Sequence, residues 1–407
     1  MDSVQKIENN PLLHIGLIAM FLLPLLPSNL KSIAIAGFGI VVLINAIRRT
    51  LSFDLKLFLI NSAVFFAIAI TMVYSEDADL VIRKLGRLSS FLVFPFIFAF
   101  TNSNERQSFF KNIDSYLWVF LIAVFLFNVL AFTWFYFTRA TFSNLLIHFH
   151  TLLRVHSGKF NIHPIYLSMH CGVAILFSLY LLRKNTSKMR LVAIILMDIV
   201  LIAFLLLYAK KGPIMALLTI LTLFMLFQRS KKYIVPYIFA VTGLVALIII
   251  VPNTRGKFVE LLKIESLDNG NVTSTNIRYT IYQSVQELIA ESPVVGYGIG
   301  DYKDELVNKY AEKDQSLLVK KKYNAHNQYF SLMLIGGGVL LLVFLCVLVF
   351  NFLFAIRFDN QMFILLLIFY GMVMLTENIL EREQGVIFFA FFFNFFTLKS
   401  LFVSGQE

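Results

Sequence analysis

Cysteine is almost absent from this sequence. Only Cys171 and Cys346 occur among 407 residues, and both lie inside apolar runs. Neither a disulfide framework nor a cysteine-based zinc site is therefore expected. Charged residues are scarce as well, because they form 14% of the chain where soluble domains carry about 25%. Together with 58% hydrophobic residues, this scarcity excludes an ordinary soluble protein and predicts an integral membrane protein.

Signals for processing and for repeats are also missing. The N-terminal stretch MDSVQKIENNPLL has little positive charge, and no small-residue cleavage site follows Leu26. We therefore expect an uncleaved first span rather than a signal peptide. The sequence shows no internal repeat and no low-complexity linker.

Long apolar runs are what the chain does contain, and they predict an all-α polytopic membrane protein with about twelve transmembrane helices. The expected cores are residues 11–27, 32–47, 55–74, 88–100, 115–137, 164–182, 191–208, 212–228, 233–251, 328–355, 361–379 and 386–402. We accordingly expect helices 1–9 in residues 1–251, a large outer loop with amphipathic helices in 252–327, and helices 10–12 in 328–407. The sequence AKKG between the seventh and eighth segments predicts a tight helical hairpin.

The distribution of lysine and arginine predicts the orientation. Short loops on one side carry more Lys and Arg than those on the other, which favours both termini in the cytoplasm. The long outer loop is then periplasmic, and the protein is expected in the cell inner membrane. The net charge of +11 is attributed to the Lys and Arg residues that set the membrane orientation, and no nucleic-acid partner is expected. The Lys and Arg residues on the outer side need another explanation, because the positive-inside rule predicts few of them there.

Within the outer loop, one stretch has the apolar period of an amphipathic helix. Its apolar positions, at i, i+4, i+7 and i+8, are Ile281, Val285, Leu288 and Ile289. We expect Asn276 to cap the start of this helix and Glu291-Ser-Pro293 to end it. Arg278 would lie in the first turn, which the helix dipole makes unfavourable for a cation. It is expected either to face an anion or to be a solvated surface residue.

A second polar cluster stands where the tenth span begins. Lys320, Lys321 and Lys322 precede His326, whose ring should lie at the membrane surface. Histidine is the side chain suited to accept a proton near neutral pH, although an interfacial histidine bonded to a carbonyl and a lysine run that attracts anionic lipid are the structural alternatives. The glycines of Gly336–Gly338 predict close packing of the span against a neighbour.

Gly296-Tyr-Gly-Ile-Gly300 has the glycine spacing of a dinucleotide-binding loop, but it follows a helix instead of a strand. We therefore expect a turn that brings two backbones close together.

Further outer cations suggest an anionic ligand. Lys210 and Lys211 stand at the outer end of the seventh span, and Arg83 and Arg87 share a helical face before the fourth. Arginine can grip phosphate oxygens with two hydrogen bonds, whereas lysine offers a point charge. Such cations could stabilise a diphosphate leaving group without a metal, while a neutral histidine takes the proton of an attacking hydroxyl.

Other candidates stay open beside these. Glu377 and Tyr329 are candidates for positioning an acceptor. Glu377 stands with Asn378, Glu381 and Arg382 at the outer end of the eleventh span, and a structural ion pair is the alternative for this group. Asp77-Ala-Asp79 has the DxD form used by metal-dependent glycosyltransferases, and four histidines crowd one loop, although neither pattern is specific. These histidines are His148, His150, His156 and His163. We expect no metal and no cofactor.

The order of these elements resembles the O-antigen ligase and O-antigen polymerase superfamily of bacterial membrane glycosyltransferases. The resemblance runs from Arg278 through SPVVGYGIGDY and a hydrophilic stretch to His-Asn-x-Tyr-Phe and the glycine-containing span. It implies a GT-C-like, metal-independent enzyme that acts on an undecaprenyl-diphosphate-linked glycan. His326 and Arg278 match the family's histidine and loop arginine. Lys211 stands where the family usually has arginine, which weakens that correspondence, since lysine lacks the bidentate grip.

We therefore expect an inverting glycan transferase with its active site facing the periplasm. In this hypothesis His326 and Arg278 are catalytic, and Lys210, Lys211, Arg83 and Arg87 bind the donor diphosphate. The preferred acceptor is lipid A-core, as in an O-antigen ligase, and the alternative is a repeat-unit polymerase. A flippase or transporter for an anionic lipid is the alternative from another class, with Asp198 as its acidic residue at membrane depth. A non-catalytic assembly factor is also open.

Overall fold

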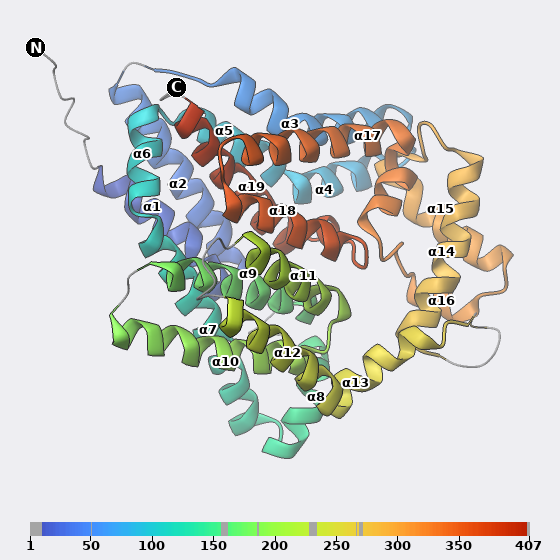
Figure 1. Cartoon of the computed structure of the whole chain (residues 1–407). Coiled ribbons are helices and arrows are strands. Elements are labelled where there is room, and N and C mark those ends of the chain that lie inside the picture. The colour runs from blue at the N-terminus through green and yellow to red at the C-terminus, as the bar shows by residue number, and fades with distance from the viewer. Residues whose placement is uncertain are drawn as a thin grey trace, which may run out of the picture.

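The computed structural model describes residues 10–49, 51–155, 162–184, 187–227, 234–265, 267 and 272–404. Within these ranges all regular secondary structure is helical, so the all-α prediction is confirmed (Figure 1). In chain order the helices are α1 (Pro11–Phe21), α2 (Ser28–Arg48), α3 (Leu55–Ile70), α4 (Ala78–Leu88), α5 (Ser90–Ala99), α6 (Ser103–Lys111), α7 (Ile113–Thr138), α8 (Phe142–Val155), α9 (Pro164–Arg183), α10 (Lys188–Tyr208), α11 (Lys211–Phe227), α12 (Ile234–Ile250), α13 (Pro252–Val259), α14 (Ser274–Glu291), α15 (Gly298–Glu312), α16 (Ser316–Lys321), α17 (Gln328–Arg357), α18 (Gln361–Met374) and α19 (Glu383–Ser404). Short 3-10 turns are η1 (Leu23–Leu25), η2 (Thr71–Tyr74), η4 (Glu260–Leu262) and η6 (Ile379–Glu381).

Each of the twelve expected apolar segments coincides with a helix, but their lengths differ. Among the described residues, seven helices are long and apolar enough to cross a membrane: α2, α3 with η2, α7, α9, α10, α17 and α19. The pair Tyr237–Ile250 and Thr254–Leu262, bent by 89°, would add an eighth if it forms one span. The remaining apolar helices α1, α5, α11 and α18 have 10–17 residues. The number of twelve crossings and the division into three regions therefore stay predictions.

Two helices form the centre of the bundle. The apolar windows of α9 and α19 are 89% and 83% buried, far more than those of the other long helices. Phenylalanines of α19 fill this centre: Phe391 and Phe395 stack on each other, and Phe21 of α1 meets each ring edge-on at 5.3 Å. Since lipid tails are as apolar as these rings, close packing rather than water exclusion holds such helices together.

A buried polar network joins three of the helices. Asn61 of α3 donates to Asn394 of α19 at 2.9 Å, and Asn351 of α17 donates to Asn61 at 3.2 Å. Thr397 of α19 completes the network by donating to Asn351 at 2.9 Å. Hydrogen bonds between side chains fix the register of helices that apolar packing alone would leave free to slide. α17 and α19, which flank the candidate site, are thereby fixed to α3.

α17 is broken near its start, and the outer loop enters the break. Gly336 and Gly337 leave helical geometry, with Gly337 at a φ of 61°. The freed backbone groups bond to the loop instead: Tyr297 N–H donates to Leu334 at 2.8 Å, and Gly338 N–H donates to Pro293 at 2.8 Å. A Cβ on Gly337 would collide with the backbone of Val294. The predicted close approaches at both glycine motifs are thus confirmed, and each motif is the other's partner.

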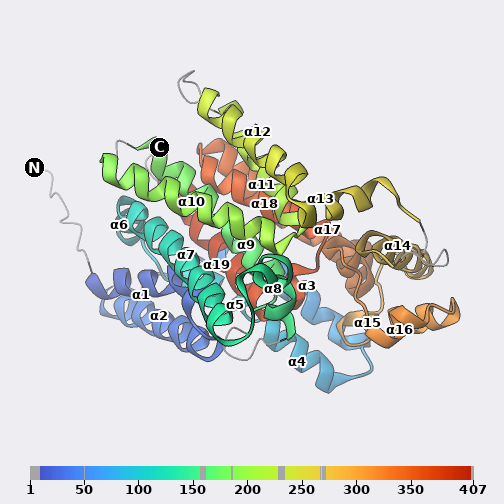
Figure 2. The ribbon, with the colours of Figure 1, turned by 90° about the horizontal axis from the view of Figure 1, so that it is seen from below.

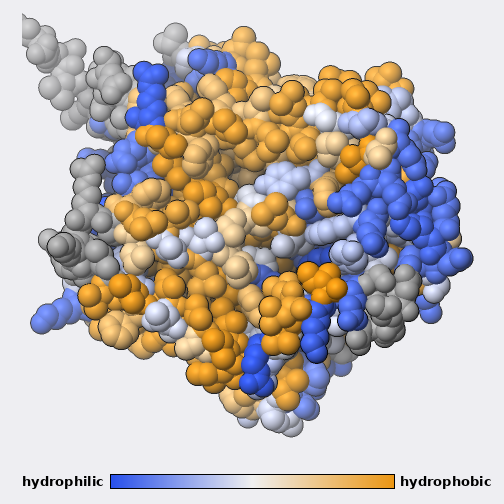
Figure 3. All heavy atoms as spheres, turned by 45° about the vertical axis from the view of Figure 1, so that its right-hand side comes forward, coloured by the Kyte–Doolittle hydropathy of each residue, from blue (hydrophilic) through white to orange (hydrophobic). Residues whose placement is uncertain are grey.

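The polar segments gather at one end of the molecule. α14, α15 and α16 lie together there, beside the start of α17 (Figures 1 and 2). Hydrophilic side chains cover this end, while the surface over the bundle is mainly hydrophobic (Figure 3). The turn between α10 and α11 is as tight as predicted, since only Ala209 and Lys210 separate the two helices. Gly212 follows, and a Cβ there would collide with Thr376; this contact holds Lys210 close to the end of α18.

Candidate active site

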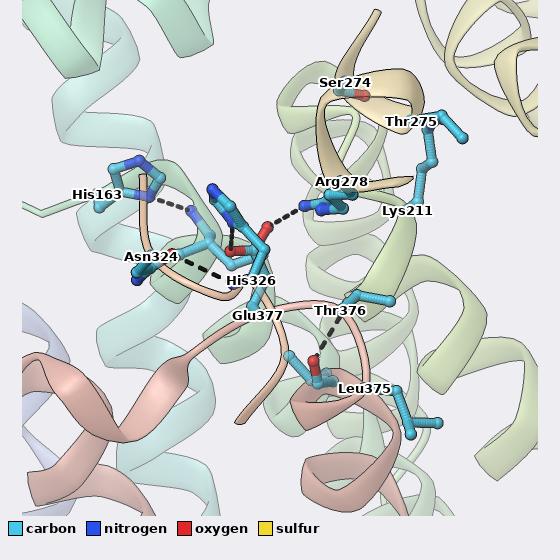
Figure 4. A network of polar contacts seen from close by, with 12 residues as sticks. His163, Lys211, Ser274, Thr275, Arg278, Asn324, His326, Leu375, Thr376 and Glu377 are labelled. Carbon is cyan, nitrogen blue, oxygen red and sulfur yellow. Dashed lines mark hydrogen bonds and ion pairs between the residues drawn. The ribbon is translucent and has the colours of Figure 1, made fainter. Parts of the chain in front are cut away.

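Glu377 connects the arginine and the histidine that the sequence singles out. It lies between α18 and η6, and its Oε1 accepts a hydrogen bond from Nη2 of Arg278 at 2.5 Å. Its Oε2 lies 3.3 Å from Nδ1 of His326 (Figure 4). An ionised carboxylate can only accept hydrogen bonds, so Nδ1 is the donor. In the neutral ring, Nε2 is then left as an acceptor for another molecule.

The backbone of His326 has an unusual conformation. Its φ is 46°, a left-handed value that costs a non-glycine residue on the order of 1 kcal/mol. Surrounding contacts hold it there: its N–H donates to Asn324 Oδ1 at 3.3 Å, and the Tyr282 hydroxyl lies 3.2 Å from its carbonyl oxygen. Asn324 in turn donates to Glu381 at 2.7 Å. Tyr282 of α14 and Asn324, which is held by Glu381 of η6, therefore fix the backbone of His326 and with it the position of the ring.

α14 carries Arg278, and its start differs from the prediction. The helix begins at Ser274 and its cap is Thr273, whose side chain accepts from Asn276 N–H at 3.1 Å. Asn276, the expected cap, is instead buried inside the helix, and its Oδ1 accepts from Glu265 N–H at 3.2 Å. Arg278 is thus the fifth helical residue rather than a first-turn residue, and Glu377 is the anion it faces. The expected apolar stripe is present, because Ile281, Val285 and Leu288 are buried.

A cavity of about 760 Å³ opens beside these residues. Its lining contains eight cationic side chains: Arg87, Arg154, Lys210, Arg278, Lys303, Lys321, Lys322 and Arg382. The acidic side chains in the lining are Glu377, Glu381 and Glu383. These residues come from segments far apart in the sequence. The excess of positive charge makes the cavity a place for an anion with several charges.

The predicted site residues divide into two groups. Five line the cavity: His326, Arg278, Lys210, Arg87 and Glu377. The other three, Lys211, Arg83 and Tyr329, do not line it.

Each of the outlying residues has another setting. Lys211 Nζ is buried and donates to Thr275 at 2.6 Å and to Glu260 at 3.0 Å, which joins α11 to α14 and η4. The Tyr329 hydroxyl donates to the carbonyl of Gly371 at 2.9 Å and so joins α17 to α18. Arg83 is exposed on α4. Lys210, by contrast, forms no hydrogen bond or ion pair with any described residue.

The electrostatics of the cavity keep Glu377 ionised. Burial alone would raise the pKa of this carboxyl, but Arg278, the hydrogen bond from His326 and the charge of Lys210 outweigh it and lower the pKa to about 2. Burial, with help from the charges of Lys210 and Arg382, lowers the pKa of His163 to about 4. His163 is therefore neutral at neutral pH and adds no charge to the cavity.

Neither of the metal-binding alternatives is assembled in the described part of the chain. Asp77 caps α4 by accepting from Leu80 N–H at 2.8 Å, so a structural role accounts for it. His163 accepts from Ile165 N–H at 3.4 Å at the start of α9. Across the described ranges, no three His, Cys, Asp or Glu residues converge in a way that could hold a metal ion. His156 lies outside the described residues.

The cavity contains further residues beside the predicted ones, among them Lys303, which the sequence did not single out, and Glu381, which the sequence pointed to only as part of the polar group around Glu377. Lys303 lies on α15, next to the buried Tyr302, and no sequence pattern separates it from Lys309 on the same helix. Glu381 accepts hydrogen bonds from the side chains of Tyr302, Asn324 and Ser331, at 3.1, 2.7 and 3.0 Å. It thereby connects three segments that lie beside the cavity. Its sequence signal was its position at the outer end of a span, close to Glu377.

Part of the chain is similar to a known protein family. Residues 196–345 match the family model described as O-Antigen ligase. The match extends from the middle of α10 to just past the middle of α17, and so contains Lys210, Arg278 and His326. No curated protein matches the chain. The resemblance noted in the sequence is thus confirmed over residues 196–345, which are similar to the O-antigen ligase family.

Proposed function

We propose that the protein is a glycosyltransferase that moves a glycan from undecaprenyl diphosphate to a sugar hydroxyl at the periplasmic face of the inner membrane. We prefer lipid A-core as the acceptor, which makes the protein an O-antigen ligase. The observation that carries the proposal is the bridge from Arg278 through Glu377 to His326 in the wall of a cation-rich cavity. The family match supports a transferase of this type.

His326 is the base in this proposal. Because Glu377 holds Nδ1 as a donor, Nε2 has the lone pair that accepts a proton from the acceptor hydroxyl. The hydroxyl oxygen attacks the anomeric carbon of the first sugar as its proton passes to Nε2. The bond from that carbon to the diphosphate oxygen breaks, and the electron pair leaves with undecaprenyl diphosphate. A single displacement of this kind inverts the configuration of the anomeric carbon.

Cations of the cavity stabilise the departing diphosphate. Lys210, Arg87 and Lys303 line the cavity without a hydrogen bond or ion pair to any described residue. Charges that are already positioned where negative charge develops lower the barrier to bond cleavage. Arg278 has two roles in this proposal. Its Nη2 donates to Glu377, while its Nε, which has no partner among the described residues, is free to donate to the diphosphate. In this proposal Lys210 takes the position at the α10–α11 turn that the resemblance had given to Lys211.

Transfer with purified protein tests the function and the site together. We expect His326→Ala to lower kcat by a factor of at least 100, since general base catalysis contributes about 10²–10⁴. Arg278→Ala should lower kcat by a similar factor, because it removes a cation and the partner of Glu377. Tyr136→Phe, a change at an exposed residue that does not line the cavity, is the control. Turnover near the parental value in either alanine variant would exclude the role assigned to that residue.

The acceptor decides between ligase and polymerase, since the family match supports both. A strain that lacks the protein should keep full-length polymer on its carrier lipid if the protein is a ligase. A polymerase instead predicts lipid A-core capped by single repeat units. Movement of a lipid-linked glycan across the bilayer without a new glycosidic bond would favour the transporter alternative and overturn the proposal.

A further inference from the structure

A second cavity lies at the opposite end of the bundle from the candidate active site. α9 connects the two: His163, which caps its start, lines the first cavity, and Arg183, its last residue, lines the second. A helix of this length is about 30 Å long, which is the thickness of the hydrocarbon core of a bilayer. The second cavity therefore lies at the other membrane surface, the cytoplasmic one in the predicted orientation.

Positive charge dominates the lining of this second cavity, which has a volume of about 330 Å³. Its cations are Arg183, Lys184 and Lys399, and its one carboxylate is Asp359. Lys184 is already neutralised, because its Nζ contacts both carboxylate oxygens of Asp114 at 2.6 and 2.8 Å.

The other two cations are not neutralised in this way. Arg183 donates through Nη1 to the neutral amide oxygen of Gln361 at 2.9 Å, which leaves its charge and its remaining N–H donors available. Lys399 forms no hydrogen bond or ion pair with any described residue. Two cations of the cavity therefore lack a directly bonded anion.

Apart from Gln361, the remaining lining is mainly apolar and belongs to helices of the bundle. Leu176 and Tyr180 come from α9, Phe224 from α11, and Met362 and Leu365 from α18. The Arg183 guanidinium lies over the Phe224 ring at 5.7 Å, so charged and apolar parts of the lining meet directly. A free phosphate ion would use the cations but would gain nothing from this wall. A molecule with an anionic head and a hydrocarbon chain would use both.

We propose that this cavity binds the headgroup of an anionic phospholipid of the cytoplasmic leaflet. The phosphate would lie between Arg183 and Lys399, and the first part of an acyl chain would run along Phe224, Met362 and Leu365. Basic pockets between transmembrane helices at the cytoplasmic surface are suited to such headgroups, and arginine offers phosphate a fork of two donors. The inference is independent of the transferase proposal, because no residue of the second cavity lines the first.

Native mass spectrometry of the detergent-purified chain tests the proposal with three probes: dioctanoyl-phosphatidylglycerol, dioctanoyl-phosphatidylcholine and inorganic phosphate. We expect phosphatidylglycerol to bind at least tenfold more tightly than phosphatidylcholine, and phosphate not to compete at millimolar concentration. The double variant Arg183→Gln with Lys399→Gln should bind phosphatidylglycerol at least tenfold more weakly. Arg183→Lys with Lys399→Arg keeps both charges and should retain most of the affinity.

Two further variants make the outcome specific. Lys188→Gln removes an exposed cation at the same membrane surface, outside the cavity, and should bind as the parental chain does. His326→Ala should also bind normally, which separates this site from the proposed transferase site. Equal phosphatidylglycerol binding by the double glutamine variant and the parental chain would overturn the proposal. Displacement of the lipid by inorganic phosphate alone would overturn it as well, since the site would then bind free phosphate.

Discussion

Lys210 and Lys211 are neighbours in the sequence, but their ammonium groups have different surroundings. Lys211 Nζ is buried, 3.0 Å from Glu260 and 2.6 Å from Thr275. Lys210 lines the cavity beside Glu377 and forms no hydrogen bond or ion pair with any described residue. Burial lowers the pKa of Lys210, while the charge of Glu377 opposes that change. A cation held in this way is ready for an anionic ligand, whereas Lys211 already has its anion.

Lys210→Ala should therefore impair transfer activity, whereas Lys211→Ala should impair stability. We expect Lys210→Ala to lower kcat/KM for glycan transfer at least tenfold while the unfolding midpoint stays close to the parental value. Lys211→Ala should lower the free energy of unfolding by about 2 kcal/mol, because Glu260 loses a buried partner. Transfer assays and thermal unfolding of both purified variants provide the comparison. The distinction would be wrong if Lys211→Ala were fully stable but inactive.

The charge of Glu377 should make stability depend on pH in a defined window. Its folded pKa of about 2 lies below the ordinary value of 4.5. A carboxyl with a depressed pKa stabilises the fold above its ordinary pKa, and this contribution is lost as the pH falls through the folded pKa. The shift corresponds to a contribution on the order of 3 kcal/mol at neutral pH. Glu377→Gln should therefore unfold at a clearly lower temperature than the parental protein at pH 6.

At pH 3 the same comparison should give a smaller difference. The carboxyl of the unfolded chain, with its ordinary pKa of 4.5, is then largely protonated, so folding has to release that proton and the contribution of the ion pair shrinks. Glu291→Gln is the matched control. Glu291 also pairs with a lysine, Lys309, but its side chain is 53% exposed. Exposed pairs of this kind contribute little, so the control should stay close to the parental protein at both pH values. A difference for Glu377→Gln that is the same at pH 6 and pH 3 would contradict the ion-pair explanation.

The sequence predicted features that depend on local patterns. Apolar runs showed where the bundle helices lie, and Ala209-Lys-Lys-Gly212 showed the tight turn between α10 and α11. The spacing of Ile281, Val285 and Leu288 gave the buried face of α14. The predicted N-cap residue of α14, Asn276, was wrong because the stretch from Asn271 to Asn276 contains several residues that can cap a helix. Packing of Asn276 against the backbone of Glu265 leaves Thr273 to do so.

Features that depend on distant contacts could not be predicted in this way. Nothing in the sequence tells which of two adjacent lysines faces Glu260, because that choice depends on where η4 lies. The bridge through Glu377 joins residues 99 and 51 positions apart, and only the assembled fold brings them together. In the sequence Lys303 cannot be distinguished from Lys309, the second lysine of α15, and only the fold shows that it lines the cavity. Local sequence patterns predict where the helices lie. The site, in contrast, is formed where the ends of several helices and the loops between them meet in the fold.

Gly337 should be essential for the connection between the outer loop and α17. Its φ of 61° disfavours any side chain, and a Cβ there would collide with the carbonyl group of Val294. Gly337→Ala therefore has to displace the loop that bonds to Gly338 and Leu334, and with it the link between α14 and the start of α17. We expect a loss of about 1–3 kcal/mol in unfolding free energy from backbone strain alone, together with a large loss of transfer activity. Gly243→Ala in α12 is the control, since nothing lies within 4 Å of its Cβ position and alanine favours a helix over glycine. Thermal unfolding and transfer assays on both variants decide the matter: a stable, active Gly337→Ala protein would show that the inserted loop does not hold Arg278 and His326 in place.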